Sequence, residues 1–545
     1  MALRVTNLRL PIEEPEANLA DHLAGALGLK PEDLGSWRVL RKALDVRDKR
    51  QLRFVYNLEV RLPHAERQIA DRWSNSAHPP VVVEAFDEPP FSMPEPGSEP
   101  LSGRPVIVGS GPGGLVCAYF LALHGYQPIV LERGSPVNER IRDVKRFDAG
   151  GAFVPESNYL FGEGGAGTFS DGKLTCRGSG PDVMRVLELF AECKGQQPGK
   201  PSILYYHRPH LGSNRLPAVV KAIRQRIERL GGEVRFSTKV EDLHFDAAGI
   251  RGVATSSGFL PTPVVVLAIG HSARDTFTML ARRHVPMTPK PFQFGVRIEH
   301  PQELVNEVQY GPLHRRYERQ LGNADYALVA HGNHDLFTFC MCAGGYIIPS
   351  VSEPGAFCTN GMSLSRRDSP YANSGLVVTV PVEAFEGSDI LAGVRLQLKY
   401  EQRAFALGRG EYACPLQRAQ DFLAGRVSRG PLPSSYPRGQ VSAELREVLP
   451  PLVAAALQDG LPILDRRWQG RFLPEAILAG PEARGSSPIR IERDPHSRES
   501  PGIRGLYPVG EGAGYAGGIV SAAVDGLRTA RAIIARYACL NRTSI

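Results

Sequence analysis

The pattern of apolar and polar positions predicts two β–α units near opposite ends of the chain. A buried β-branched run at residues 105–108 precedes a helical stretch at 115–124, and a second buried run follows at 128–131. Far along the chain, a short strand at 505–511 leads into a helix at 519–537 whose apolar positions recur at helical spacing. Alternating strands and helices of this kind predict a parallel sheet.

Between these units lies an amphipathic helix at residues 216–230, which Gly231 and Gly232 end. Four strand-like runs follow and predict a strand, a small β-meander and a buried returning strand, at 233–240, 242–246, 249–256 and 264–269. The region from about residue 291 to 487 then mixes strands with helices such as 390–405. We interpret it as an inserted α+β domain.

The first 86 residues predict a separate small α/β module, with strands at 3–10, 37–45 and 52–62 and a helix at 17–27. The segment 87–103 is rich in proline and serine, which is typical of an extended linker that packs poorly. The predicted fold is α/β: a Rossmann-like domain (parallel sheet plus β-meander) with an inserted α+β domain and the N-terminal module. The predicted boundaries are 1–86, 87–103, 104–290, 291–487 and 488–545.

Composition excludes several classes of protein. The 545 residues are 42% hydrophobic and 22% charged, and no apolar run approaches the roughly 20 residues that span a bilayer. The first residues lack the apolar core of a signal peptide, and the eight cysteines form no CxxC motif. We therefore expect a soluble, cytoplasmic protein with reduced thiols, no membrane partner and no metal site. The net charge of +7 is a weak indication of nucleic-acid binding.

The sequence Gly109-Ser-Gly-Pro-Gly-Gly114 joins the first strand to its helix. Gly109 permits a tight turn, Gly111 lets a pyrophosphate approach the backbone, and Gly114 lets the helix pack closely on the strand. The helix N-terminus offers N–H groups and a partial positive charge to phosphates. Glu132, at the end of the second strand, is placed to accept hydrogen bonds from a ribose. This arrangement predicts dinucleotide binding.

The returning strand predicts that the dinucleotide is FAD, because a nicotinamide dehydrogenase needs only the first unit. Glu511 can hold ribityl hydroxyls, and the helix from Gly518 can face the pyrimidine edge of the flavin. The glycine-rich stretch 158–174 is expected to pass close to the cofactor. The predicted cofactor-binding residues are Gly109, Gly111, Gly113, Gly114, Glu132, Arg133, Gly165, Ala166, Gly167, Val240, Gly270, Gly510, Glu511, Gly518 and Ile519.

The chain resembles the glutathione-reductase-type flavoprotein superfamily, and within it a bacterial family labelled only "FAD-dependent dehydrogenase". The resemblance covers nearly the whole chain and depends on five blocks: 158–174, 339–345, 360–363, 415–422 and 510–519. It implies a flavin-dependent redox activity on an undefined substrate. Two blocks depart from the family pattern, 211–214 and 482–486, where Ala483 and Gly485 replace threonines.

Candidates for chemistry beyond the cofactor are Glu163, Asp171, Lys173 and Arg484, of which Lys173 or Arg484 could fix an anionic substrate or the flavin. Each could instead be a loop charge paired with a neighbour. Cys340 and Cys342 are two apart on a predicted strand and hence on one face, and we favour core thiols over a redox or metal role. His207 and His210 are interpreted as loop residues.

These observations predict an oxidoreductase that binds FAD non-covalently and takes a small-molecule substrate between the insert and the flavin. NAD(P)H, if it is the donor, would dock only transiently, because no second Gly-x-Gly-x-x-Gly follows; alternatively the substrate itself donates hydride. Two other hypotheses stay open. One is a non-catalytic or RNA-associated FAD protein that uses the basic turn near Arg41, Lys42, Lys49 and Arg50, and the other is an NAD-dependent dehydrogenase without flavin.

Overall fold

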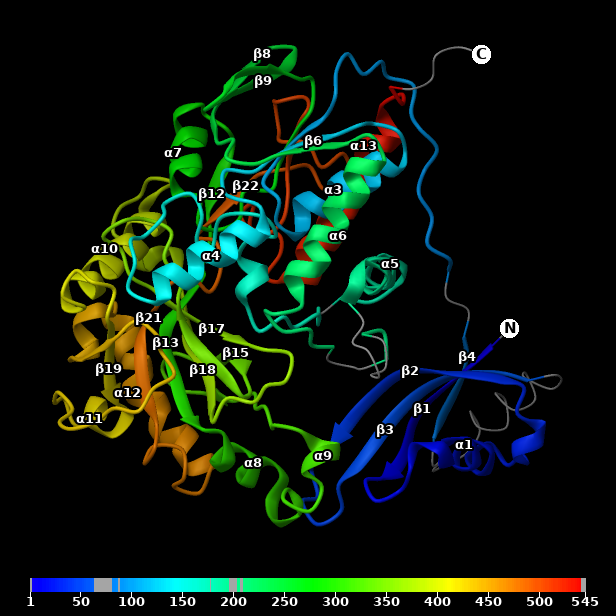
Figure 1. The fold of residues 1–545 in the computed structure, drawn as a ribbon, viewed down its shortest axis with the longest axis vertical. Helices are drawn as coiled ribbons and strands as arrows, with labels where there is room; N and C mark the ends of the chain where they lie inside the picture. The colour runs from blue at the N-terminus through cyan, green and yellow to red at the C-terminus, as the bar shows by residue number, and fades with distance from the viewer. Residues whose placement is uncertain are drawn as a thin grey trace.

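The computed structural model describes residues 2–62, 81–86, 89–176, 178–195, 203–205 and 209–540. Three parts are visible in Figure 1: a small N-terminal sheet, a domain built on a parallel sheet, and a domain built on a larger mixed sheet. Within the described residues, no helix is both long and apolar enough to cross a membrane.

The parallel sheet brings the two ends of the chain together. Its strands are β5 (Val106–Val108), β6 (Ile129–Leu131), β7 (Glu233–Arg235), β11 (Val265–Leu267) and β23 (Leu506–Pro508). Their order is β23-β11-β5-β6-β7, and the neighbouring strands pair in parallel. The predicted α/β fold with a parallel sheet is confirmed, and the late strand β23 lies two places from β5.

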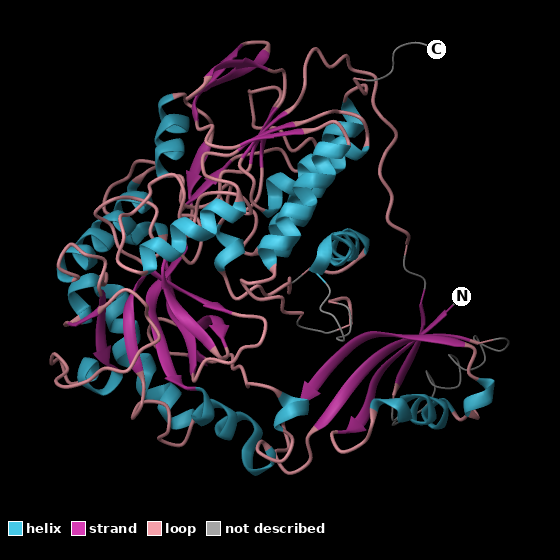
Figure 2. Ribbon diagram, in the orientation of Figure 1, coloured by secondary structure: helices cyan, strands magenta, loops and turns pink. Residues whose placement is uncertain are grey.

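Helices α3 (Pro112–Leu123), α6 (Leu216–Arg229) and α13 (Ile519–Arg536) lie side by side over the sheet (Figures 1 and 2). Glycines allow the close approach. A Cβ at Gly114 would lie 2.0 Å from the Gly109 carbonyl oxygen, and one at Gly526 would lie 2.0 Å from the Gly113 carbonyl oxygen. The C-terminal helix therefore packs directly on the helix that follows the first glycine turn.

The remaining elements of this domain are a β-meander and further helices. The meander has the order β10-β9-β8 and comprises β8 (Val240–Asp246), β9 (Gly249–Thr255) and β10 (Gly258–Pro261). The predicted strand at 233–240 is instead the short β7 followed by a turn into β8. The helices are α4 (Val137–Asp148), α5 (Pro181–Phe190) and α7 (Arg274–Arg282).

The insert is built on a seven-stranded sheet of order β14-β15-β18-β13-β21-β19-β20. Its strands are β13 (Phe292–Pro301), β14 (Val329–Ala330), β15 (Leu336–Cys342), β18 (Tyr371–Val380), β19 (Cys414–Arg418), β20 (Gln440–Ser442) and β21 (Ile477–Glu482). A hairpin, β16 (Gly345–Pro349) with β17 (Thr359–Ser363), lies beside it. The longer helices are α8 (Gln302–Tyr310), α10 (Ala392–Leu407) and α12 (Pro451–Arg467), and the shorter ones are α9 (Glu318–Leu321) and α11 (Ala419–Leu423).

The chain enters and leaves the insert at one place. Strand β12 (Met287–Pro289) pairs in antiparallel register with β22 (Ile489–Ile491). The two crossings are thus held side by side, which fixes the insert against the carboxyl ends of the parallel strands.

The N-terminal module is an antiparallel sheet of order β2-β3-β1-β4 with α1 (Leu19–Leu27) packed on one face. Its strands are β1 (Ala2–Pro11), β2 (Ser36–Asp45), β3 (Arg53–Arg61) and β4 (Val82–Phe86). The described part of the predicted linker, 89–103, packs better than its composition indicates. The Gly97 N–H donates to the Ile534 carbonyl oxygen (2.8 Å), and Glu99 pairs with Arg536 (2.8 Å).

Candidate functional site: a cavity between the parallel sheet and the insert

A cavity of about 400 Å³ opens at the carboxyl ends of the parallel strands. Both glycine-rich turns line it, the first with Gly109, Gly111 and Gly113 and the second with Gly510 and Gly518. Ligands of open α/β sheets bind at this edge, where the strand order reverses. The two distant turns therefore face one common space.

Two helices begin at this cavity without a capping side chain. Gly111 precedes α3 and Gly518 precedes α13, and neither helix has an acidic residue in its first turn. Free N–H groups and the positive end of the helix dipole favour an anion at such a position. Both turns of the cavity therefore favour the binding of a negatively charged ligand group.

Gly111 shows that the space is suited to a group close to the backbone. A Cβ at this position would meet no atom within 4 Å, and its φ of −70° is open to any residue. Local strain therefore does not explain the glycine, whereas a pyrophosphate against the backbone does. Gly114 lies outside the cavity lining and serves the packing of α3.

Glu132 lines the cavity, but protein donors engage its carboxylate. The Ser110 N–H and hydroxyl donate to Oε2 (3.0 and 2.6 Å), and the N–H groups of Gly134 and Gly162 donate to Oε1 (2.9 and 3.0 Å). A carboxylate offers about four acceptor positions. Glu132 therefore ties the first glycine turn to the loop at Gly162, and a ribose hydroxyl would have to share one of these positions.

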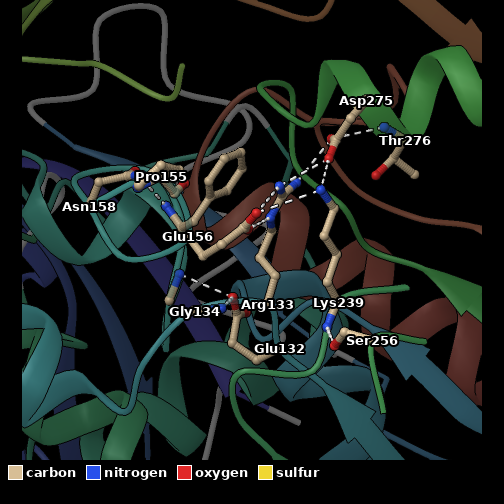
Figure 3. A network of polar contacts seen from close by, with 12 residues as sticks. Glu132, Arg133, Gly134, Pro155, Glu156, Asn158, Lys239, Ser256, Asp275 and Thr276 are labelled. Carbon is tan, nitrogen blue, oxygen red and sulfur yellow. Dashed lines mark hydrogen bonds and ion pairs between the residues drawn. The ribbon is translucent and has the colours of Figure 1, made fainter. Parts of the chain in front are cut away.

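Arg133 joins a network of charges at the rim beside Glu132 (Figure 3). Its guanidinium contacts Glu156 and donates twice to Asp275 (3.0 Å each), and Lys239 pairs with Asp275 at 2.6 Å. Although burial opposes ionisation, Arg133 and Lys239 lower the pKa of Asp275 to about 2. Arg133 also lies over the Phe161 ring at 4.2 Å. The network links four segments of the domain.

Glu511 lines the cavity next to the second turn. Burial raises the pKa of this carboxyl to about 7, while the nearby Lys290 works in the opposite direction. No described residue donates a hydrogen bond to its side chain. A carboxyl in this state is suited to accept hydroxyl donors from a ligand.

The remaining predicted cofactor residues also line this space. Gly165, Ala166, Gly167, Val240, Gly270 and Ile519 are all part of the lining. Arg140, which the sequence did not single out, holds the first three in place. This fully buried guanidinium donates to the carbonyl oxygens of Asn158 (2.8 Å), Glu163 (2.9 Å) and Gly165 (2.9 Å). One buried cation thus organises the glycine-rich loop.

Asp171 and Lys173 form a charged cluster on the insert side of the cavity. Lys173 Nζ lies 2.6 Å from Asp171 Oδ2 and also donates to the Met341 carbonyl oxygen. Asp171 further accepts from the Ser363 hydroxyl (2.6 Å) and Arg367 (3.3 Å). Burial opposes charge on both residues, but their attraction holds the pKa of Asp171 low and that of Lys173 high. The pair is therefore ionised.

Arg484 lines the cavity but is committed to Glu401. Two of its nitrogens donate to the Glu401 carboxylate (2.8 and 2.6 Å), and a third contacts Ser352. Its neighbour His271, another lining residue, bonds through Nδ1 to the Ser272 hydroxyl (2.7 Å). Burial and the nearby Arg484 lower the pKa of His271 to about 4, so the imidazole is neutral. Sequence analysis missed this histidine, which no motif marks.

Glu163 does not line the cavity. Its fully buried carboxylate accepts from the Val137 N–H (2.7 Å) and pairs with Arg224 (2.7 Å). The residue therefore connects the N-terminus of α4 to α6, and the geometry gives it no access to a substrate.

Cys340 and Cys342 do not share one face, contrary to the prediction. The pairing of β15 with β18 gains one residue between Phe339 and Cys342, and Cys340 has a φ of +46°. Cys342 is fully buried, whereas Cys340 lines the cavity. The bulge turns one thiol out of the core, a feature that strand periodicity cannot reveal.

His210 contacts the Ser363 hydroxyl through Nε2 (2.8 Å), and His207 lies outside the described residues. Elsewhere on the insert, Glu303, Glu307 and His314 bring three potential metal ligands within 4.8 Å of one another. Arg471 already pairs with Glu307 at 2.6 Å. These acids are therefore committed to surface ion pairs.

Several cations of the basic turn in the N-terminal module have partners within the chain. Lys42 contacts Glu16, Arg47 pairs with Asp45 (2.6 Å), and Lys49 donates to the Val308 carbonyl oxygen (2.6 Å). Two of these cations thus meet acids of the N-terminal module, whereas Lys49 contacts the insert.

Three family models match separate parts of the chain. Residues 107–159 match an NAD(P)-binding Rossmann-like domain, residues 291–485 match the family described as FAD-dependent protein, C-terminal domain-like, and residues 2–61 match a domain of unknown function. A Clostridium beijerinckii protein, described as uncharacterized, is 40% identical over 543 residues, covering 98% of this chain and 99% of that protein.

Solved structures of low identity show similarity over most of the chain. Glycine oxidase from Bacillus cereus is 13% identical with a TM-score of 0.34, covering 79% of this chain and 95% of that one. A geranylgeranyl bacteriochlorophyll reductase-like protein from Thermoplasma acidophilum is 12% identical with a TM-score of 0.34, covering 80% and 78%. Because the Clostridium beijerinckii protein matches over nearly the whole length of both chains, this chain belongs to the same family. It carries a Rossmann-like nucleotide-binding domain together with a domain like the C-terminal domain of FAD-dependent proteins.

Proposed function

We propose that this protein is an FAD-dependent oxidoreductase of the glutathione-reductase-type superfamily that acts on a small molecule. The observation that carries the proposal is that the turns at Gly111 and Gly518, together with Glu511, line one cavity. A nicotinamide dehydrogenase would need only the first turn. The match of residues 291–485 to FAD-dependent proteins supports the same cofactor.

Each part of the cradle has a task in holding FAD without a covalent bond. The N-terminus of α3 would bind the pyrophosphate, and Glu132 and Arg133 would lie at the adenosine end. Glu511 would accept hydrogen bonds from ribityl hydroxyls, and the N-terminus of α13 would favour negative charge on the flavin. When bound, FAD supplies hydride transfer to or from the substrate.

The protein groups of the insert side position the substrate and exchange protons. Lys173 is held as a cation by Asp171, so it can attract an anionic group or donate a proton. His271 is a neutral imidazole, and its pKa of about 4 makes it a hydrogen-bond partner for a ligand and only a weak proton acceptor. Arg484 contributes positive potential but has few donors left for a ligand, because Glu401 and Ser352 engage it.

The absorption spectrum of the purified protein tests the proposal, because oxidised flavin absorbs near ~450 nm. Anaerobic mixing with NADH and with NADPH then identifies the electron donor. Bleaching by one of them would support a nicotinamide-linked enzyme with transient docking, and no bleaching would support a substrate that donates the hydride itself. A folded protein that holds no flavin and takes none up would remove the proposal.

A further inference from the structure

Cys340 occupies an unusual position on the insert side of the cavity. It is half-buried, lines the cavity beside Phe339 and Asn360, and has a φ of +46°. Residues other than glycine rarely adopt this conformation, and such outliers cluster at functional sites. The extra residue in β15 at this point breaks the alternation of the strand and places Cys340 in the cavity lining.

Two cations hold the backbone in this conformation. Arg297 Nη2 donates to the Cys340 carbonyl oxygen at 2.7 Å, and Lys173 Nζ donates to the next carbonyl oxygen, that of Met341. Arg297 is itself fixed by Glu482, at 2.8 Å, and is fully buried. The segment is thus clamped between two fixed positive charges, which makes its geometry rigid.

These charges act on the thiol as well. The groups that face Cys340 are Lys173, Arg297, Asp171, Glu482, Glu511 and Cys342. The neighbouring Cys342 thiol, Lys173 and Arg297 lower the pKa of the Cys340 thiol, against the effect of burial. A thiolate in an accessible, electropositive surrounding is a nucleophile.

Lys173 provides a proton at the same place. A lysine ammonium has three N–H donors. Asp171 and the Met341 carbonyl oxygen engage two of them, and no described residue accepts from the third. Since Lys173 also lines the cavity, this donor is available to a ligand next to Cys340.

We infer that Cys340 is the nucleophilic residue of the cavity and adds to the carbonyl carbon of the substrate, with Lys173 as proton donor. In this step the Cys340 Sγ–C bond forms, the carbonyl π pair moves to oxygen, and the oxygen takes a proton from Lys173 Nζ. No oxidant or reductant is needed for the addition. The inference rests on the proposed function, because it takes the insert side of this cavity as the substrate site.

The test is the rate at which iodoacetamide alkylates each cysteine of the FAD-loaded protein between pH 5 and 9, followed by peptide mass spectrometry. We expect the Cys340 rate to reach half of its maximum at a pH below about 8.5, the usual pKa of a cysteine thiol. At pH 6.5 it should exceed the rates of Cys176 and Cys539, which are also half-buried, by about fivefold or more, since a larger thiolate fraction outweighs the lower nucleophilicity of a low-pKa thiol.

Matched variants test whether Lys173 is the cause of the fast reaction of Cys340 at low pH. Lys173→Met should move the Cys340 profile to higher pH by about one unit or more, whereas Lys239→Met, which removes a cation at the opposite end of the cavity, should leave it unchanged. Millimolar 4-nitrobenzaldehyde should slow alkylation of Cys340 reversibly, and 4-nitrobenzyl alcohol should not. Lack of protection by the aldehyde would overturn the carbonyl assignment.

The flavin band of the same sample separates the two claims. If a sample has bound flavin but its Cys340 reacts no faster than Cys176, only the assignment of Cys340 as the nucleophile is overturned. A sample without flavin would overturn the proposed function regardless of the thiol.

Discussion

The two sides of the cavity are built in different ways. On the side of the parallel sheet, glycines and helix ends form the surface, so backbone groups face the ligand. On the insert side, the surface consists of side chains such as Lys173, Cys340 and Arg484, which come from distant segments and are held by buried ion pairs. The first side is suited to a common nucleotide, whereas the second can differ between members of a family while the fold is kept.

The largest expected effect concerns the buried ion pair that supports the insert side. Arg297→Met leaves the Glu482 carboxylate buried without its partner, so the free energy of unfolding should fall by about 3–5 kcal/mol. Urea denaturation measures it. The double variant Arg297→Met/Glu482→Leu should recover most of the loss, because no charge is then left uncompensated. A loss below about 1 kcal/mol in the single variant would contradict this role.

The Gly111→Val variant tests whether the sheet side of the cavity binds the flavin nucleotide. Its side chain would project into space that no protein atom occupies within 4 Å, so folding should be unchanged while flavin binding weakens by on the order of 100-fold, or about 2.7 kcal/mol. The retained 450 nm absorbance after gel filtration reports it. Gly25→Ala, a position with equally free surroundings in α1, is the control and should keep its flavin.

Glu511 lies beside the second glycine turn and interacts electrostatically with Cys340 on the insert side. We therefore expect the free energy of unfolding to depend on pH. The pKa of Glu511 is raised by burial to about 7 in the folded protein and is about 4.3 when unfolded. The neutral carboxyl therefore stabilises the folded apoprotein fully below about pH 4, and this contribution is lost as the pH rises through about 7. Relative to Glu511→Gln, the wild type should lose about 2–3 kcal/mol of unfolding free energy between pH 5 and 8. Parallel pH profiles of the two proteins would contradict this.

The rim network of Figure 3 should matter least. Asp275→Asn removes the carboxylate that Arg133 and Lys239 share, but the group is exposed and such pairs contribute about 0–1 kcal/mol. We expect a loss of about 0.5 kcal/mol that disappears in 1 M salt, and less than about threefold weaker flavin binding. A larger effect that persists in high salt would show that the rim belongs to the binding site proper.

The same contrast explains what could be predicted from the sequence. The turn at Gly109–Gly114 and the returning Gly510–Glu511 are readable because their function depends on local backbone and spacing. Strand periodicity assumes no bulge and therefore places Cys340 and Cys342 on one face, whereas the extra residue in β15 depends on pairing with β18. Arg140 lies in a segment without a motif, and only the tertiary fold brings it to the cavity loop. His271 directly follows the predicted cofactor residue Gly270, and that position was the only signal for it. Glu163 was expected at the site because it is close in sequence to the glycines, but its carboxylate turns toward Arg224.

The central claim is that two distant glycine turns bind one flavin. The most direct measurement is the amount of FAD released from purified, denatured protein per chain, in the wild type and in Gly111→Val. The account predicts close to one FAD per wild-type chain and its loss from the folded variant. A folded wild-type protein without FAD that binds none when it is added, or a Gly111→Val variant that retains a full complement, would contradict it.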